Sequence, residues 1–209
     1  MTKTPLWKQI KDDIRQDKLP IDQLLTQQWL SDHYKVSRIP VRDAIQRLSL
    51  AGWFIAHGKK GVQIPPLNAA QAQELYLMRM PLEALALELS FDKINFAVLG
   101  RAEDILTQLT DTTSLSPLEQ GVLNLQFHYC LYQACERPTL LRTLTQLHEQ
   151  CERYLGFQAH TLDYHSRSEA EHYQLLKALR DKELGLAQQI LKRHIEQAGE
   201  ILVAHLEGC

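Results

Sequence analysis

The stretch VSRIPVRDAIQRLSLAGW, residues 36–53, is the most informative about the fold of the first third of the chain. Ser37 is a typical N-cap residue, and a proline is tolerated in the first turn of a helix. Apolar residues at positions 41, 44, 45 and 48 recur at helical spacing, so they predict one buried face. Arg38, Arg42 and Gln46 are four residues apart and therefore share the opposite face. The pattern predicts an amphipathic helix that ends at Ala51-Gly52 and exposes two guanidinium groups and an amide.

Two further helices and a hairpin are predicted around this segment. Apolar spacing predicts a helix over residues 6–15, and Thr26 can cap a second helix that runs to Tyr34. Short strand patterns at 53–56 and 62–64 enclose a basic, glycine-containing tip from His57 to Gly61. The order helix, helix, turn, helix and two-stranded wing is typical of a winged helix-turn-helix DNA-binding domain.

The exposed face of residues 37–48 has the chemistry of a surface that reads a DNA major groove. Arginine pairs with guanine edges or phosphate, and glutamine pairs with adenine. Ser37 and the helix N-terminus can donate hydrogen bonds to phosphate. A solvated helix surface is the ordinary explanation for such a trio of side chains in isolation. The flanking helix, the tight turn and the basic hairpin favour DNA reading instead.

Charge is distributed unevenly along the chain. The net charge of the whole chain is −2, but residues 1–66 contain eleven Lys or Arg against six Asp. The other residues contain twelve basic and nineteen acidic side chains. A basic first segment on an acidic body suits a protein whose N-terminal part meets a polyanion.

Pro65-Pro66 divides the chain into a DNA-binding domain, residues 1–66, and an all-helical domain, residues 67–209. The expected fold is therefore mainly α: a winged helix-turn-helix followed by a six-helix bundle. A kink is expected at Pro81 in the first helix of the bundle. Helical periodicity in the second part predicts helices over 69–90, 96–109, 117–135, 139–157, 167–180 and 183–206.

Composition excludes several other classes of protein. No stretch approaches the roughly 18 to 20 apolar residues of a membrane span, and residues 1–11 contain no apolar run of a secretory signal. We therefore expect a cytoplasmic protein without a membrane partner. The four cysteines form no CxxC pair, which favours idle reduced thiols.

Three of the nine histidines stand among the apolar residues of their predicted helices: His128, His172 and His194. Neutral imidazoles that converge from three helices can hold a divalent transition metal such as zinc or nickel. Asn124 lies one helical turn before His128 on the same face. A purely hydrogen-bonding polar pocket is the alternative. The remaining histidines of the helical part, at positions 148, 160, 165 and 205, are interpreted as structural or solvent-facing.

The stretch at 36–53 closely resembles the recognition-helix pattern of the GntR family of bacterial repressors. The resemblance implies that Arg38 and Arg42 contact DNA, and that Lys59 or Lys60 of the wing reaches the minor groove or the backbone. The family usually has an arginine that contacts DNA at the start of the second helix. Gln28 stands in that place here and can form hydrogen bonds but cannot neutralise a phosphate.

The helical part resembles the FCD effector domain of the FadR branch of that family, in its shorter VanR-like group. His128, His172 and His194 match the metal-binding motif of such domains, while Asn124 replaces the usual aspartate. Arg79, in the pattern R-x-x-L-E, corresponds to a residue beside the effector cavity, which implies that it can grip an effector carboxylate. The alternative for Arg79 is a surface i,i+4 ion pair with Glu83.

These observations predict a homodimeric transcription regulator that binds double-stranded operator DNA, associates with the nucleoid and responds to a small organic acid. The acid is expected at a metal site in the helical domain, because an uncharged ligand set leaves a divalent cation in need of an anionic partner. A regulator that senses the metal directly is the first alternative. A metal-dependent hydrolase or lyase is the second, but no carboxylate is placed as a general base and an enzyme does not need the wing; we therefore do not expect an enzyme.

Overall fold

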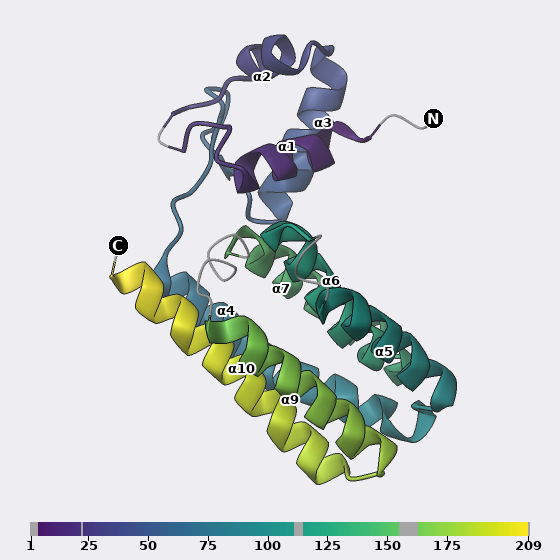
Figure 1. Cartoon of the computed structure of the whole chain (residues 1–209). Helices are drawn as coiled ribbons and strands as arrows, with labels where there is room; N and C mark the ends of the chain where they lie inside the picture. The colour runs from purple at the N-terminus through teal and green to yellow at the C-terminus, as the bar shows by residue number, and fades with distance from the viewer. Residues whose placement is uncertain (1–3, 22, 111–114, 155–162, 209) are drawn as a thin grey trace. The chain divides into compact units, whose positions relative to one another are not determined.

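A computed structural model gives the fold of residues 4–21, 23–110, 115–154 and 163–208. The chain divides into two compact units, Met1–Leu67 and Asn68–Cys209 (Figure 1). The first unit contains three helices and a small hairpin, and the second contains six longer helices among the residues that the structure describes. Each unit is described by itself below.

The N-terminal unit has the predicted order of elements. Its helices are α1 (Leu6–Arg15), α2 (Gln27–Tyr34) and α3 (Arg38–Leu50). The hairpin consists of β1 (Ile55–Ala56) and β2 (Val62–Gln63), which pair antiparallel with Ile55 opposite Gln63. Val62 also forms an antiparallel bridge with Leu25, which ties the wing to the segment before α2.

Both strands are shorter than the sequence predicts. In β1 the reason is that Trp53 and Phe54 form the C-terminal hydrogen bonds of α3 instead of strand pairs. Their backbone N–H groups donate to the carbonyl of Leu48 at 2.8 and 3.4 Å, so they close the C-terminus of α3. Their side chains are almost fully buried, at 0% and 3% exposure. The apolar run at 53–56 thus supplies core residues first, and only its end at Ile55 enters the sheet.

Burial of one face of each helix holds this unit together. The apolar stripe of α3 that the sequence predicts packs inward, and Val41, Ala44 and Leu48 are buried. Thr26 caps α2 as predicted, since its Oγ1 accepts from the N–H of Trp29 at 3.0 Å. The turn between α2 and α3 is made by Lys35, whose φ of 52° is left-handed. The buried cluster consists of Ile10, Leu19, Leu25, Leu30, Val41, Ala44, Leu48, Trp53, Phe54, Val62 and Ile64.

The second unit is a helical bundle, as the sequence predicts. Helix α10 lies along α4 and α9, while α5 packs against α6, and α4 also contacts α7 (Figure 1). Gly199 allows α10 to approach α4 closely, because a Cβ there would lie 2.8 Å from the Cβ of Tyr76. The helices are α4 (Ala69–Ser90), α5 (Phe96–Thr110), α6 (Pro117–Tyr132), α7 (Pro138–Cys151), α9 (Asp163–Arg180) and α10 (Leu184–Glu207).

Two of the predicted helix ends are wrong. Helix α6 ends at Tyr132, and a single 3₁₀ turn, Gln133–Cys135, leads to the left-handed Glu136. Helix α7 ends at Cys151 and a second 3₁₀ turn follows over Glu152–Tyr154, whereas the predicted end at 157 lies outside the described residues. Helix α4 continues through Pro81. Within the described part of the chain, no helix is both long enough and apolar enough to cross a membrane.

Candidate functional site

The first candidate site is the exposed face of α3. Arg38, Arg42 and Gln46 are exposed, while the stripe on the other side of the helix is buried in the core of the N-terminal unit. Ser37 occupies the N-cap position, but its side chain makes no capping hydrogen bond. Its exposed hydroxyl is therefore not used by the helix. The structure presents two guanidinium groups and an amide along one accessible helix face, with an exposed hydroxyl at the N-cap.

The tip of the wing presents two cations beside this unit's helices. Lys59 and Lys60 are both exposed, between Gly58 and Gly61. Gly61 has a φ of 144°, and a Cβ there would lie 2.5 Å from the carbonyl oxygen of Leu25. Only glycine therefore fits where the hairpin passes that backbone, which fixes the position of the tip.

Gln28 is exposed, and its side-chain amide is hydrogen-bonded to two neighbouring side chains. Its Oε1 accepts a hydrogen bond from Nη2 of Arg38 at 2.5 Å, and its Nε2 donates to Oδ1 of Asp32 at 2.8 Å. The sequence gives Gln28 as a possible DNA contact, but it does not show that this amide is engaged with two neighbours on the protein.

The second candidate site is a buried histidine cluster, defined by His128 on α6, His172 on α9 and His194 on α10. One ring nitrogen from each residue lies within 4.8 Å of the other two. The Nε2 atoms of His128 and His172 are 3.2 Å apart. The exposed fractions of the three residues are 0%, 1% and 4%, so the cluster is enclosed. The structure thus brings together the three histidines that the sequence singles out.

The outer nitrogens of two of these rings are held by hydrogen bonds. Nδ1 of His194 lies 2.9 Å from Oε2 of Glu171, a carboxylate oxygen that accepts a hydrogen bond from the ring N–H. Nδ1 of His128 lies 3.3 Å from the hydroxyl of Tyr132. That hydroxyl donates to Oε2 of Glu83 at 2.6 Å, so it accepts from His128. A proton on Nδ1 leaves the lone pair on Nε2, the nitrogen able to bind a cation.

Burial favours the uncharged form of two rings of the histidine cluster, those of His128 and His172. It lowers the pKa of His128 and His172 well below the usual imidazole value, and the neighbouring His194 lowers both further. A neutral imidazole is the form that binds a metal.

Arg79 and Glu83 form an ion pair that is buried rather than exposed. Nε of Arg79 donates to Oε1 of Glu83 at 2.7 Å, and the side chains are 6% and 0% exposed. The alternative prediction for Arg79, an ion pair with Glu83 at the surface, is therefore wrong about where the pair lies. The helix face that carries both residues is covered by α7 and α6. His148 on α7 also donates to Oε1 of Glu83 at 2.9 Å, and Tyr132 on α6 donates to Oε2.

These donors keep Glu83 ionised in the interior. Burial alone would raise the pKa of Glu83, but Arg79 and then His148 hold it well below its usual range. Burial and the adjacent Glu83 raise the pKa of Tyr132, so its hydroxyl remains a donor. The result is one buried carboxylate that joins α4, α6 and α7 and connects through Tyr132 to the histidine cluster.

Sequence reasoning did not assign Tyr132, His148 or Glu171 to this site, and it gave Glu83 only as the surface ion-pair partner of Arg79. Tyr132 lies four residues after His128, a spacing that places both on one helix face and was available as a signal. Glu171 directly precedes His172, and no spacing rule predicts that it bonds to His194 on another helix. His148 is structural, as interpreted, because it holds Glu83. His160 lies outside the described residues, as does the side chain of His165, whereas His205 is half-buried.

Unpartnered polar atoms show whether the site fits a metal. Oδ1 of Asn124 is buried and has no hydrogen-bond partner among the described residues, and the same holds for Nδ1 of His172. A buried acceptor without a partner is costly unless something else binds it. With three neutral imidazoles from separate helices, this donor set fits a divalent transition metal. Cys130, Cys135 and Cys151 are buried free thiols.

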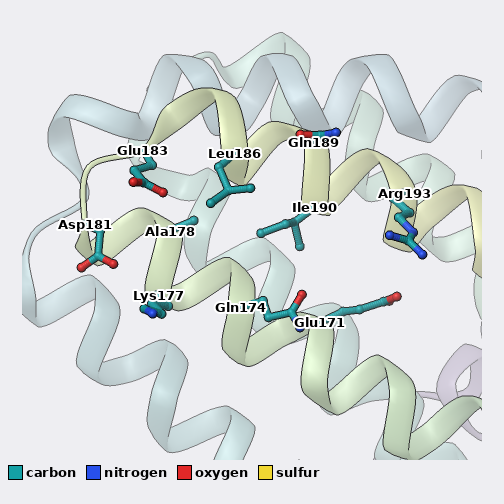
Figure 2. A pocket seen from close by; sticks show the side chains of 10 residues that line it. All are labelled: Glu171, Gln174, Lys177, Ala178, Asp181, Glu183, Leu186, Gln189, Ile190 and Arg193. Carbon is teal, nitrogen blue, oxygen red and sulfur yellow. The ribbon is translucent and has the colours of Figure 1, made fainter.

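A groove lies between α9 and α10, and it reaches the histidine cluster only through Glu171, since none of the three histidines lines it. Glu171, which holds His194, also lines this groove together with Gln174 on α9 and Ile190 and Arg193 on α10 (Figure 2). The groove is open and carries side chains of both charge signs. The carboxylate that orients one histidine is thus accessible from outside.

The fold and the two sites define a class of protein: a helix-turn-helix DNA-binding unit with a basic wing, joined to a helical domain that contains an enclosed polar site. Comparisons with known proteins identify the family. Residues 4–64 match the bacterial regulatory proteins of the gntR family, and residues 74–197 match the FCD domain. The chain belongs to the GntR-family regulators that carry an FCD domain.

Its relatives are transcription regulators rather than enzymes. The chain is 27% identical to the Nta operon transcriptional regulator of Aminobacter aminovorans. The alignment spans 181 residues and covers 86% of this chain and 84% of that protein. It is 28% identical over 183 residues to the uncharacterized HTH-type regulator YdhC of Bacillus subtilis, covering 85% and 80%. Among solved structures, McbR/YncC of Escherichia coli has the same fold, with a TM-score of 0.78 at 20% identity, covering 98% and 100% of the two chains.

The resemblance to GntR and FCD proteins and the mainly helical fold are thereby confirmed. The chain is a DNA-binding transcription regulator with an FCD effector-binding domain.

Proposed function

We propose that this regulator binds operator DNA as a homodimer through α3 and the wing, and that a small organic acid in the helical domain controls this binding. The observation that carries the DNA part is the face of α3, where Arg38, Arg42 and Gln46 are exposed opposite a fully buried stripe. Lys59 and Lys60 at the wing tip add cations for phosphate or the minor groove. A dimer would place two such helices in successive major grooves of a near-palindromic site in the bacterial cytoplasm.

The histidine cluster supports a metal site as the place where the acid binds. His128, His172 and His194 would hold a divalent metal such as zinc or nickel, with Oδ1 of Asn124 as a fourth oxygen ligand. When bound, the metal would supply a positive centre that attracts an anion, because three imidazoles and an amide bring no negative charge. Glu171 and Tyr132 orient two of the imidazoles from outside.

Arg79 is the second proposed contact for the acid. Glu83 occupies its Nε, so an effector carboxylate would bind through the Nη groups. Because Arg79 and Glu83 are both buried, an acid there would compete with, or share, an existing ion pair. Such differential contact is the condition for a ligand to shift the equilibrium between two arrangements of the protein.

DNA fragments from around the regulator's own gene test the DNA part. The wild type should bind one of them with an affinity that falls steeply with salt, and Arg38→Ala with Arg42→Ala should abolish this binding. Arg101→Ala, which removes an exposed cation from the helical domain, is the matched control and should bind normally. If no fragment is bound specifically, or if the two α3 variants bind as the wild type does, the proposal is wrong.

Elemental analysis tests the metal part. The purified protein should contain a divalent transition metal, and His172→Ala should lose it while His205→Ala retains it. No metal after reconstitution, in protein shown to be folded, would leave a hydrogen-bonding pocket as the better explanation.

A panel of organic acids then separates effector control from direct metal sensing. If an acid is the signal, one member of the panel changes the DNA affinity of the metal-loaded protein. If the metal is the signal, chelation alone switches DNA binding reversibly without unfolding the helical domain. The dimer is tested by the mass of the protein in solution, where a monomer at DNA-binding concentrations contradicts the proposal.

A further inference from the structure

A hydrogen-bonded chain of three side chains runs across the helix-turn-helix, from α2 to the first residue of α3. Asp32 accepts from Nε2 of Gln28 at 2.8 Å, and Oε1 of Gln28 accepts from Nη2 of Arg38 at 2.5 Å. Gln28 and Asp32 are one turn apart on α2, and Arg38 begins α3. The first guanidinium of the DNA-reading face is thus tied to the preceding helix.

Chemistry fixes the orientation of the Gln28 amide. An arginine side chain can only donate hydrogen bonds, and an ionised carboxylate can only accept them. The amide oxygen must therefore face Arg38 and the amide nitrogen must face Asp32. The other orientation would set two donors against each other at one end and two acceptors at the other, so Asp32 determines which way Gln28 points.

The hydrogen bond from Arg38 to Gln28 has an energetic reason at this position. A cation in the first turn of a helix meets the positive end of the helix dipole, so Arg38 gains from an acceptor nearby. An exposed arginine also samples many rotamers, and this freedom is lost when it contacts DNA. Holding Arg38 before DNA arrives removes part of that loss and limits the directions in which its guanidinium can point.

We propose that Gln28 is a positioning residue of the DNA-reading surface: with Asp32 it holds Arg38 in one direction and so sets the base preference where Arg38 contacts DNA. This inference rests on the proposed DNA-reading role of α3. It assigns Gln28 a role through Arg38 and not through a contact of its own with DNA, because both ends of its amide are engaged with protein.

The experiment uses the full-length protein and a pool of DNA duplexes with a randomised core. Selection with the wild type yields a preferred sequence, and affinities for that sequence and for unrelated duplex are then measured for each variant. Gln28→Ala should lower affinity for the preferred sequence about three- to tenfold, the range expected from loss of one typical hydrogen bond, and relax preference at only a few base positions. Gln27→Ala, a neighbouring exposed glutamine on α2, is the matched control and should change nothing.

The double variant shows whether Gln28 acts through Arg38. In an Arg38→Ala background, Gln28→Ala should have no further effect on the sequence profile or on affinity. If the two substitutions reduce affinity independently, Gln28 contacts DNA directly and the inference is wrong.

Two further measurements exclude a merely structural role. Gln28→Glu keeps an acceptor for Arg38, so it should retain the wild-type base preference even though its added negative charge weakens binding to all duplexes. In the DNA-free protein, the Nε–H of Arg38 should become more mobile in Gln28→Ala than in the wild type by NMR relaxation, and unchanged mobility overturns the tie. If Arg38→Ala itself leaves DNA binding intact, the proposed function fails. The NMR measurement still tests, independently of DNA, whether Gln28 restrains the side chain of Arg38.

Discussion

Replacing Tyr132 with phenylalanine removes one buried oxygen atom and tests the polar network of the helical domain. Phenylalanine fills the same space, so the change creates almost no cavity. Arg79 and His148 both donate to Oε1 of Glu83, whereas Tyr132 donates to Oε2. Loss of a hydrogen bond to a buried charged group costs about 1.5–3 kcal/mol. The free energy of unfolding of the helical domain should fall by that amount.

The distribution of tryptophan makes the assay specific for one domain. All three tryptophans, at positions 7, 29 and 53, lie in the N-terminal unit. Urea unfolding followed by tryptophan fluorescence therefore reports on that unit, while far-UV circular dichroism is dominated by the helical domain. For a loss of about 2 kcal/mol and a denaturant dependence of about 2 kcal/mol/M, the circular-dichroism midpoint should move down by about 1 M. The fluorescence midpoint should not move.

Tyr129→Phe is the matched control, because Tyr129 lies on the same helix and its hydroxyl has no hydrogen-bond partner among the described residues. Its midpoint should equal that of the wild type. If Tyr132→Phe also unfolds at the wild-type midpoint in metal-free buffer, the network through Glu83 contributes no stability and the reasoning fails. In metal-loaded protein, Tyr132→Phe should further weaken metal binding about 10- to 100-fold, because His128 loses the acceptor for Nδ1.

Three other substitutions or conditions test the structure. Gly199→Ala should destabilise the helical domain by about 1–2 kcal/mol, because the new Cβ would lie 2.8 Å from Tyr76, whereas Gly185→Ala on the same helix has open space and should be neutral or slightly stabilising in urea unfolding. Glu171→Gln should weaken metal binding about 10- to 100-fold in a competition titration with a chelator, since His194 loses its charged acceptor, and unchanged affinity would show that the carboxylate does not orient the ring. In metal-free protein the helical domain should lose stability as the pH falls below about 6.5, because two imidazoles of the histidine cluster have a pKa lowered by burial and bind protons only after unfolding. The free energy of unfolding should then fall by up to about 1.4 kcal/mol per pH unit for each ring. A free energy of unfolding that stays constant between pH 7.5 and 5.5 would contradict the burial of these rings as neutral groups.

The polar interior of the helical domain connects most of its helices. Glu83 lies on α4, Tyr132 and His128 on α6, His148 on α7 and His172 on α9. Hydrogen bonds link these side chains one to the next, from His148 through Glu83, Tyr132 and His128 to His172. His194 on α10 completes the histidine cluster. A ligand that changes the position of one imidazole thus acts on contacts made by five helices. Such a network is a physical basis for transmitting ligand binding, and the variants above measure its strength.

Local sequence patterns were enough to predict the order of the helices, most of their bounds, and the buried face of α3. Apolar periodicity is a local property, so it placed Val41, Ala44 and Leu48 inward and left Arg38 and Arg42 exposed. The same reasoning placed His128, His172 and His194 among inward-facing residues. Because neighbouring side chains on a helix face the same way, these features follow from spacing alone.

Which helix faces pack against one another follows from the fold of the whole domain. The sequence pattern of an i,i+4 pair such as Arg79 and Glu83 is the same whether the pair is exposed or buried. Its burial depends on contacts from α6 and α7, helices that come later in the chain. The partner of Glu83 on α6, Tyr132, is 49 residues away, and Arg38 is tied to a residue of the preceding helix. Periodicity shows that a face is covered but not which helix covers it, because that choice is made by packing of the whole domain.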